Sequence, residues 1–336
     1  MKILVLGGSG HIGQRLLQVL SATSWANARG ASRSAPANGA DSLRLDSLRG
    51  EELRGALKGF DAVVNCVAGD AGSIAEGARV LTEAALLAGR PRIIHLSTQS
   101  VYGLREGRVD ENTPLDPSLG WYGKAKCQAE SHMHAYAERG GEVITLRPGC
   151  VYGPGSELWV GRVGRWLRAG RLGDLGVAGD GWSNLVHVDD VCQAVALSLQ
   201  MPVAPGNFPI FNLAAPDSPR WNGYFVDLAM LIGATPVRRL GQRQLKLDAW
   251  LAGPPLKIAE KLFKRAGIGG IHLPDALPPG LLGLWSQHIQ LDAQNASGSL
   301  GVAWTPYTSG LRSSADWFMS RYLEAKAPSG EPACSP

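Results

Sequence analysis

Residues 2–13, KILVLGGSGHIG, are the strongest indication of the fold in this sequence. Its apolar run KILVL is typical of a buried parallel strand, and the segment GQRLLQVLSA that follows has the apolar spacing of a helix. The glycines between them, in the pattern G-x-x-G-x-x-G, allow a tight turn and a close backbone approach to a diphosphate at a helix N-terminus, where free N–H groups favour negative charge. An ordinary strand–helix turn is the alternative interpretation, but the place of the pattern at the start of a strand–helix–strand unit favours dinucleotide binding. The expected contacts are Gly7, Ser9, Gly10, His11, Ile12 and Gly13.

Strand-like and helical segments alternate over about the first 150 residues. DAVVNCVAG, PRIIHLST and EVITLRPG are predicted strands, while 26–33 is a weak strand former that only its position marks as a strand. This alternation predicts an α/β fold, a Rossmann-type doubly wound parallel sheet covered by helices on both faces.

Beyond Pro154 the alternation fades, although 185–199 and FPIFNLA add one more helix and strand. We therefore expect residues 1–155, with a return segment at about 185–215, to form a NAD(P)-binding Rossmann domain. Residues of about 156–184 and 216–326 are expected to form a smaller, mixed C-terminal lobe that binds the substrate. The Pro- and Ser-rich stretch 327–336 is predicted to be a disordered tail.

The composition excludes several classes of protein. The 336 residues are 45% hydrophobic and 18% charged, as in an ordinary soluble globular protein, and no run is apolar enough to predict a membrane span. The formal net charge of +4 comes without a long basic stripe, so we expect no nucleic-acid partner. Five scattered cysteines without a CxxC pair, and an N-terminus too short for a secretory signal, indicate a cytoplasmic protein. No His, Cys or acid cluster has metal-ligand spacing, so no metal is expected.

The end of the second strand is expected to meet the adenosine ribose of the dinucleotide. An acidic residue there would suit the 2′-hydroxyl of NAD, whereas an Arg suits the 2′-phosphate of NADP. The sequence offers GASRSAP with Arg33, so NADP is the expected cofactor and NAD the alternative. Asp46 is expected either to bind the adenine amino group or to be an exposed helix N-cap, and Ala68, at the end of a predicted strand, to line the cofactor.

Tyr122 and Lys126 lie four residues apart in WYGKAK, and on a helix they would share one face. A free Tyr has a pKa near 10, and a nearby ammonium favours the phenolate, so the pair is suited to exchange a proton with an alcohol or a ketone. The segment HLSTQSVYG adds the hydroxyls of Ser97, Thr98 and Ser100 at the end of a strand, where ligands bind in open α/β sheets.

Five segments together resemble the extended short-chain dehydrogenases/reductases, the NAD(P)-dependent epimerase/dehydratase superfamily. They are GGSGHIG, HLSTQSVYG, WYGKAK, LRPGCVYGPG and LVHVDD, in this order over roughly the first 190 residues. The resemblance implies catalytic roles for Thr98, Tyr122 and Lys126, with the last two also contacting the cofactor, as Arg147 and Pro148 are expected to do. It also implies a homodimer. The family usually has Pro before the Tyr, and here Trp121 replaces it beside the expected substrate.

At a position expected to contact the substrate, this sequence differs from the family members that act on nucleotide sugars. Relatives acting on nucleotide sugars usually carry an Arg where this chain has Asn184, whereas relatives that reduce less charged substrates tend to carry Asn. Ser100, Trp121 and Asn184 are the candidate substrate contacts. Gln99 stands where the family's dehydratases use an acidic residue, which disfavours dehydration.

These residues favour an NAD(P)-dependent dehydrogenase or reductase acting on a small molecule. A nucleotide-sugar 4-epimerase or dehydratase is the first alternative, and a non-catalytic dinucleotide sensor is the second. Four arginines in VGRVGRWLRAGR, Arg162, Arg165, Arg168 and Arg171, suit either phosphate binding or a solvated helix face. The basic amphipathic stretch 256–266 suits a core-packed helix better than a membrane-surface helix.

Overall fold

A computed structural model describes residues 1–33, 42–204, 206–248, 275 and 277–326. The predicted tail 327–336 and the basic stretch 256–266 lie outside the described residues. Among the described residues, no helix has both the length and the apolar character needed to cross a membrane.

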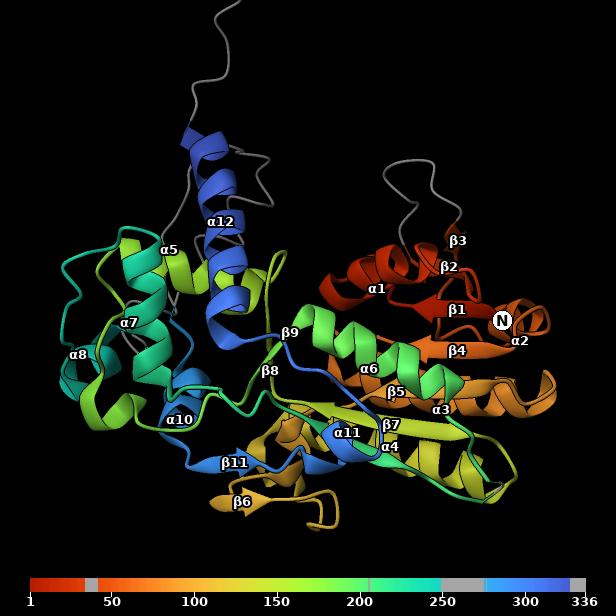
Figure 1. Ribbon diagram of the computed structural model, residues 1–336. Helices are drawn as coiled ribbons and strands as arrows, with labels where there is room; N and C mark the ends of the chain where they lie inside the picture. Colours follow the sequence, from red (N-terminus) through yellow and green to blue (C-terminus); the bar gives the residue numbers. More distant parts are fainter. Residues whose placement is uncertain (34–41, 205, 249–274, 276, 327–336) are drawn as a thin grey trace, which may run out of the picture. The chain divides into compact units, whose positions relative to one another are not determined.

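A seven-stranded parallel sheet forms the centre of the N-terminal part of the chain (Figure 1). The strand order is β10-β7-β5-β4-β1-β2-β3. This order, with crossover helices on both faces, confirms the predicted doubly wound Rossmann-type fold. The strands are β1 (Lys2–Leu6), β2 (Asn27–Ser32), β3 (Ser42–Arg44), β4 (Ala62–Asn65), β5 (Arg92–Leu96), β7 (Val143–Pro148) and β10 (Ile210–Leu213).

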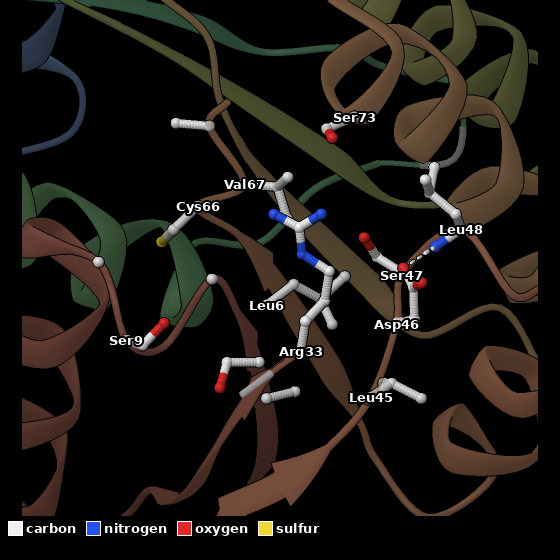
Figure 2. Close-up of a pocket in the computed structure, with 15 residues that line it drawn as sticks. Leu6, Ser9, Arg33, Leu45, Asp46, Ser47, Leu48, Cys66, Val67 and Ser73 are labelled. Atoms are coloured by element: carbon white, nitrogen blue, oxygen red, sulfur yellow. Dashed lines mark hydrogen bonds between the residues drawn. The ribbon is translucent and has the colours of Figure 1, made fainter. Parts of the chain in front are cut away.

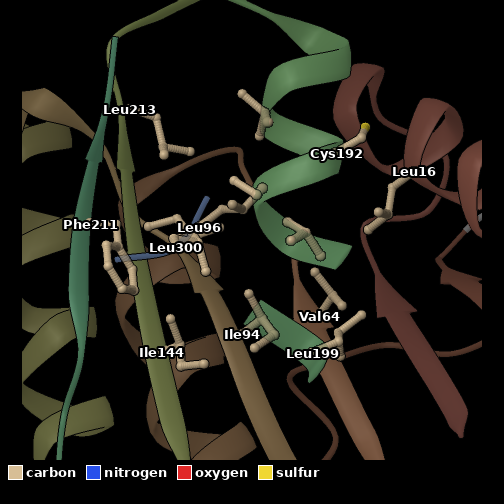
Figure 3. Close-up of a cluster of buried hydrophobic side chains, with 14 of the residues drawn as sticks. Leu16, Val64, Ile94, Leu96, Ile144, Cys192, Leu199, Phe211, Leu213 and Leu300 are labelled. Carbon is tan, nitrogen blue, oxygen red and sulfur yellow. The ribbon is translucent and has the colours of Figure 1, made fainter. Parts of the chain in front are cut away.

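Helices cover both faces of this sheet, which explains why its strands are apolar on both sides. On one face, α1 (His11–Ser21) and α6 (Val188–Gln200) pack over a core that Figure 3 shows, including Leu16, Ile94 and Cys192. On the other face, α2 (Gly50–Leu57), α3 (Ala71–Leu87) and α4 (Trp121–Glu138) pack over a second core that includes Val63, Ile93 and Val143.

The weak strand former at 26–33 is β2, and its poor strand composition has a packing reason. A Cβ atom on Gly30 would lie 2.8 Å from the Cδ1 atom of Leu17, and one on Gly8 would lie 2.9 Å from the Gly30 Cα atom. The strand must therefore be small at Gly30 to let the glycine-rich turn pass close beside it.

The chain divides into two compact units. The first consists of Met1–Val151, Asn184–Ser218 and His288–Thr305, and the second of Tyr152–Ser183, Pro219–Gln287 and Pro306–Pro336. Our expected boundaries placed 288–305 in the C-terminal lobe, whereas the structure places these residues in the first unit. There β11 (Ile289–Leu291) pairs with β6 (Gly107–Val109), and Ala296 is buried in the core beside α6. The first unit also holds β9 (Leu185–His187), which pairs with β8 (Cys150–Tyr152), and the short helix α11 (Gln294–Gly298).

The second unit is mostly helical, with a core of aromatic side chains. Trp166, Trp221 and Trp285 are fully buried, and the Trp221 ring stacks on Phe225 with 5.6 Å between ring centroids. This core gives a packing reason for the tryptophans of the sequence, most of which lie beyond Pro154. The helices described are α5 (Arg162–Arg168), α7 (Trp221–Leu231), α8 (Gln242–Leu247), α10 (Pro279–Ser286) and α12 (Tyr307–Lys326).

Candidate active site

The glycine-rich turn joins β1 to α1 by backbone contacts that side chains would block. Gly7 has a φ of +76°, and the N–H groups of Gly7 and Gly8 both donate to the Ala31 carbonyl at 3.1 Å. A Cβ atom on Gly13 would lie 2.3 Å from the Gly7 carbonyl oxygen, so α1 reaches the turn only with glycine at that position. The helix begins at His11, with Gly10 as its N-cap. The turn therefore presents backbone next to a helix N-terminus, the arrangement that suits a diphosphate.

A cavity of about 190 Å³ opens beside this turn, at the carboxyl ends of β1 to β4 (Figure 2). Of the predicted cofactor contacts, it brings together Gly7, Ser9, Gly10, Arg33, Asp46 and Ala68. His11, Ile12 and Gly13 are not among its lining residues, because they begin α1 and Ile12 packs against the core. In the part of the chain that the structure describes, nine further residues line the cavity and were not singled out by the sequence. Eight lie at or just after the ends of strands, and one, Ser73, lies in the first turn of α3: Leu6, Ala31, Ser32, Leu45, Ser47, Leu48, Cys66, Val67 and Ser73.

Arg33 and Asp46 contribute opposite charges to the cavity. Arg33 is exposed, and its side chain extends over the cavity in Figure 2. Asp46 accepts a hydrogen bond from the Leu48 N–H at 3.1 Å, so one of its oxygens holds the local turn, while Arg49 is the N-cap of α2. The helix N-cap interpretation of Asp46 is therefore wrong, but its side chain does stabilise the turn before that helix.

Thr98 and Tyr122 come together because α4 packs closely on the turn after β5. The Thr98 hydroxyl acts on the Tyr122 phenol and lowers its pKa. Thr98 begins the short 3₁₀ turn Gln99–Tyr102, and its Oγ1 accepts the Ser100 N–H at 3.2 Å and lies 3.4 Å from the Ser100 hydroxyl. Burial raises the pKa of Tyr122, and the Thr98 hydroxyl partly opposes that rise. The phenol is consequently neutral at neutral pH.

Lys126 lies one turn further along α4, buried at 3% exposure. Its ammonium donates to the Leu96 carbonyl at 2.6 Å, and burial lowers its pKa to about 8, opposed by the Cys66 thiol and by Glu130. We expected this ammonium to push the Tyr122 phenol towards ionisation. In the structure the influences on the phenol are burial, the Thr98 hydroxyl and the Cys150 thiol.

Arg147 occupies a buried ion pair and does not line the cavity. Its Nη2 lies 2.6 Å from Glu130 Oε2, its Nε donates to Glu130 Oε1 at 3.0 Å, and its Nη1 donates to the Tyr102 hydroxyl at 2.9 Å. Glu130 also accepts from Ser97 at 2.5 Å. This network ties α4 to the ends of β5 and β7, where Pro148 is the last residue of β7. The guanidinium is therefore engaged in this network and is not among the residues that line the cavity, and its contact with the cofactor stays a prediction.

The candidate substrate contacts differ sharply in exposure. Trp121 is 58% exposed, and its ring meets the Tyr122 ring edge to face at 5.7 Å. Asn184 is only 3% exposed, with a left-handed φ of +44° that Asn tolerates better than most residues. Its amide donates to Gln99 Oε1 at 2.8 Å and to the Ile289 carbonyl at 2.9 Å, and accepts from the Leu291 N–H at 3.0 Å. The Asn184 amide thus holds β11 and Gln99 in place, and it is committed to these internal bonds.

Gln99, which stands where the family's dehydratases use an acidic residue, is also turned inward. It is 6% exposed, and its Nε2 lies 3.6 Å from the Cys150 sulfur while its Oε1 accepts from Asn184. Partners so distant along the chain leave no signal in a single sequence.

The arginine cluster of the second unit is engaged in contacts within that unit. Arg165 pairs with Asp275 and Glu157, and Arg171 pairs with Asp248. Arg168 donates to the Ile232 carbonyl at 2.7 Å and lies over the Tyr322 ring. These contacts indicate a structural role for Arg165, Arg168 and Arg171. Within the described ranges, no group of three or more His, Cys, Asp or Glu side chains could hold a metal ion.

Comparison with known proteins identifies the family to which this chain belongs. A sequence model described as the NAD dependent epimerase/dehydratase family matches residues 3–214. The protein YeeZ of Escherichia coli (strain K12) is 30% identical over 254 residues, which are 70% of this chain and 86% of YeeZ. The 2′-dehydrokanamycin reductase of Streptomyces kanamyceticus is 27% identical over 207 residues, 58% of this chain and 57% of that enzyme.

Among solved structures, the UDP-glucuronic acid 4-epimerase from Bacillus cereus, in complex with UDP-glucuronic acid and NAD, has the same fold. Its TM-score is 0.72 at 20% identity, over 96% of this chain and 100% of that one.

Proposed function

This chain is an enzyme of the NAD dependent epimerase/dehydratase family, and we propose that it transfers a hydride between NADP and a carbonyl or secondary-alcohol carbon. The observation that carries the proposal is the Tyr122 phenol, whose pKa responds to the Thr98 hydroxyl and which is followed one helical turn later by Lys126. Cofactor binding is supported by the glycine-rich turn, whose backbone borders a cavity with Arg33 in its wall.

Each of the three residues has a distinct chemical task in this proposal. The Tyr122 phenol gives its proton to the substrate oxygen during reduction, and the Thr98 hydroxyl donates a hydrogen bond to the same oxygen. The raised pKa of Tyr122 suits this acid role, because the phenol carries its proton at neutral pH. Lys126, with a pKa of about 8, is mostly charged at neutral pH and would bind the nicotinamide ribose. When bound, the dinucleotide supplies or accepts the hydride.

NADP is favoured over NAD by the wall of the cavity. Arg33, Ser32 and Ser47 together offer a guanidinium and two hydroxyls, which suit a 2′-phosphate. Among the lining residues that the structure describes, the acid is Asp46, which follows β3 and already accepts the Leu48 N–H. NAD remains the alternative.

The substrate is proposed to be an uncharged carbonyl compound. Asn184 stands where relatives acting on nucleotide sugars usually have an Arg, and its buried amide has no free donor for a diphosphate. Gln99 supplies no acid or base, which argues against dehydration. The alternative is a nucleotide-sugar 4-epimerase, favoured by the activity of the Bacillus cereus enzyme. A non-catalytic sensor is disfavoured because Thr98, Tyr122 and Lys126 are all present.

The test incubates the protein with NADPH and a panel of uncharged ketones and aldehydes, following the absorbance of reduced nicotinamide. A parallel series contains NAD and UDP-sugars, with proton NMR of the sugar C4 position. We expect net NADPH oxidation with a carbonyl substrate and no C4 inversion. Inversion of a UDP-sugar without net consumption of cofactor would establish the epimerase alternative instead.

A further inference from the structure

Three polar side chains form a row across the middle of the sheet: Asn65 in β4, His95 in β5 and Thr145 in β7. Asn65 is the register neighbour of His95, and His95 is the register neighbour of Thr145. Their exposures are 5%, 1% and 0%. Because side chains alternate along a strand, this polar row faces the same side as the core under α3 and α4. Buried polar groups at such a place need hydrogen-bond partners.

The hydrogen bonds of Asn65 determine which nitrogen of His95 carries the proton. Asn65 Oδ1 accepts the Val67 N–H at 3.2 Å, so its Nδ2 is the donor in the 3.3 Å contact with His95 Nδ1. His95 Nδ1 is therefore the acceptor, and the proton lies on Nε2. Burial, together with the charge of Lys126, lowers the pKa of His95, which keeps the ring neutral.

Two polar atoms of this row lack a hydrogen-bond partner among the described residues. They are His95 Nε2 and Thr145 Oγ1. One is a donor and the other can donate or accept, and they belong to paired positions on strands about 4.8 Å apart. Leaving both without a partner would be unfavourable in an apolar core, and a single water molecule can serve both.

We infer that His95 and Thr145 hold a buried water molecule, which positions the Cys66–Ala68 wall of the cavity through His95 and Asn65. The chain of contacts runs from the water to His95, from His95 to Asn65, and from Asn65 to the Val67 N–H. Cys66, Val67 and Ala68 line the cavity, so a shift of Asn65 would change the position of the cavity wall. His95 is thus a positioning residue, and the part of this inference that concerns the ligand rests on the proposed function.

A crystal structure at a resolution that reveals waters tests the site directly. We expect a water within hydrogen-bond distance of both His95 Nε2 and Thr145 Oγ1. A dry site, or a direct hydrogen bond between these two atoms, overturns the inference. The crystal structure requires neither a substrate nor a variant, so it shows whether the water is present even if the protein binds no dinucleotide. Failure to bind a dinucleotide would contradict the proposed function and not the water site.

The positioning role is tested with a matched pair of variants at Thr145. Thr145→Val removes the hydroxyl at nearly constant shape, and Thr145→Ser retains it. We expect Thr145→Val to weaken NADPH binding about fivefold, and Thr145→Ser to bind as the unmodified protein does, even if both variants lower the unfolding temperature equally. Equal NADPH affinity in all three proteins would overturn the positioning role.

Discussion

A Cβ atom on Gly123 would lie 2.7 Å from the carbonyl oxygen of Ser100, so α4 approaches the turn after β5 at a distance that only glycine permits. Gly123 directly follows Tyr122, and Ser100 lies two residues after Thr98. The close approach therefore brings the phenol near the Thr98 hydroxyl, which lowers its pKa. The glycine in WYGKAK is explained by this contact.

Replacing Gly123 with Ala should separate Tyr122 from Thr98. Because the obstructing atom is backbone, α4 or the turn must shift, and we expect a loss of about 1–3 kcal/mol in unfolding free energy together with lower turnover. Denaturant unfolding and the carbonyl reductase assay measure the two effects. Gly55→Ala in α2 is the matched control, since its Cβ would meet nothing within 4 Å. A Gly123→Ala protein as stable and active as the control would refute the close-packing argument.

The Thr98 hydroxyl lowers the pKa of Tyr122 against the opposing effect of burial. Thr98→Val should therefore move the titration of Tyr122 to higher pH. The titration is read from phenolate absorbance as the difference between each protein and the same protein carrying Tyr122→Phe, which removes the signal of the other tyrosines. An unchanged or lower midpoint would mean that the two hydroxyls do not interact.

Because Lys126 is buried, the free energy of unfolding should change with pH in the alkaline range. Its folded-state pKa of about 8 is below the ordinary value of 10.5, so the unfolded chain binds more protons between these values. The contribution of Lys126 to unfolding free energy should therefore rise as pH increases from about 8 to 10.5, by up to about 3 kcal/mol. The comparison is with Lys126→Met, which cannot titrate, by denaturant unfolding at each pH. Parallel pH profiles for the two proteins would contradict the lowered pKa.

Arg33 should decide between the two dinucleotides. If its guanidinium meets a 2′-phosphate, NADPH binds more tightly than NADH, and Arg33→Ala removes the difference by weakening NADPH alone. Fluorescence titration of both reduced dinucleotides gives the affinities. Arg44→Ala is the control, because Arg44 is exposed and is not among the residues that line the cavity. Equal affinity for both dinucleotides in the unmodified protein would remove the basis for NADP.

Local patterns in the sequence predicted the sheet and the glycine-rich turn. The spacing of apolar residues, the residues of turns and the ends of strands all depend on residues that are close together along the chain. The inward-facing bonds of Asn184 and Gln99 could not be predicted that way, since their partners are Ile289, Leu291 and Cys150. The place of β11 in the first unit was missed for the same reason. The Tyr122 phenol is neutral because burial raises its pKa. The four-residue spacing between Tyr122 and Lys126 carries no information about that burial.

The decisive variant replaces Tyr122 with Phe, which keeps the ring and removes the proton that the phenol is proposed to donate. NADPH affinity and NADPH-dependent carbonyl reduction are measured on the same preparation. We expect unchanged NADPH affinity and a fall in turnover of about 10²–10⁴-fold. Retention of turnover by the Tyr122→Phe protein would contradict the assignment of Tyr122 as the acid of the reaction.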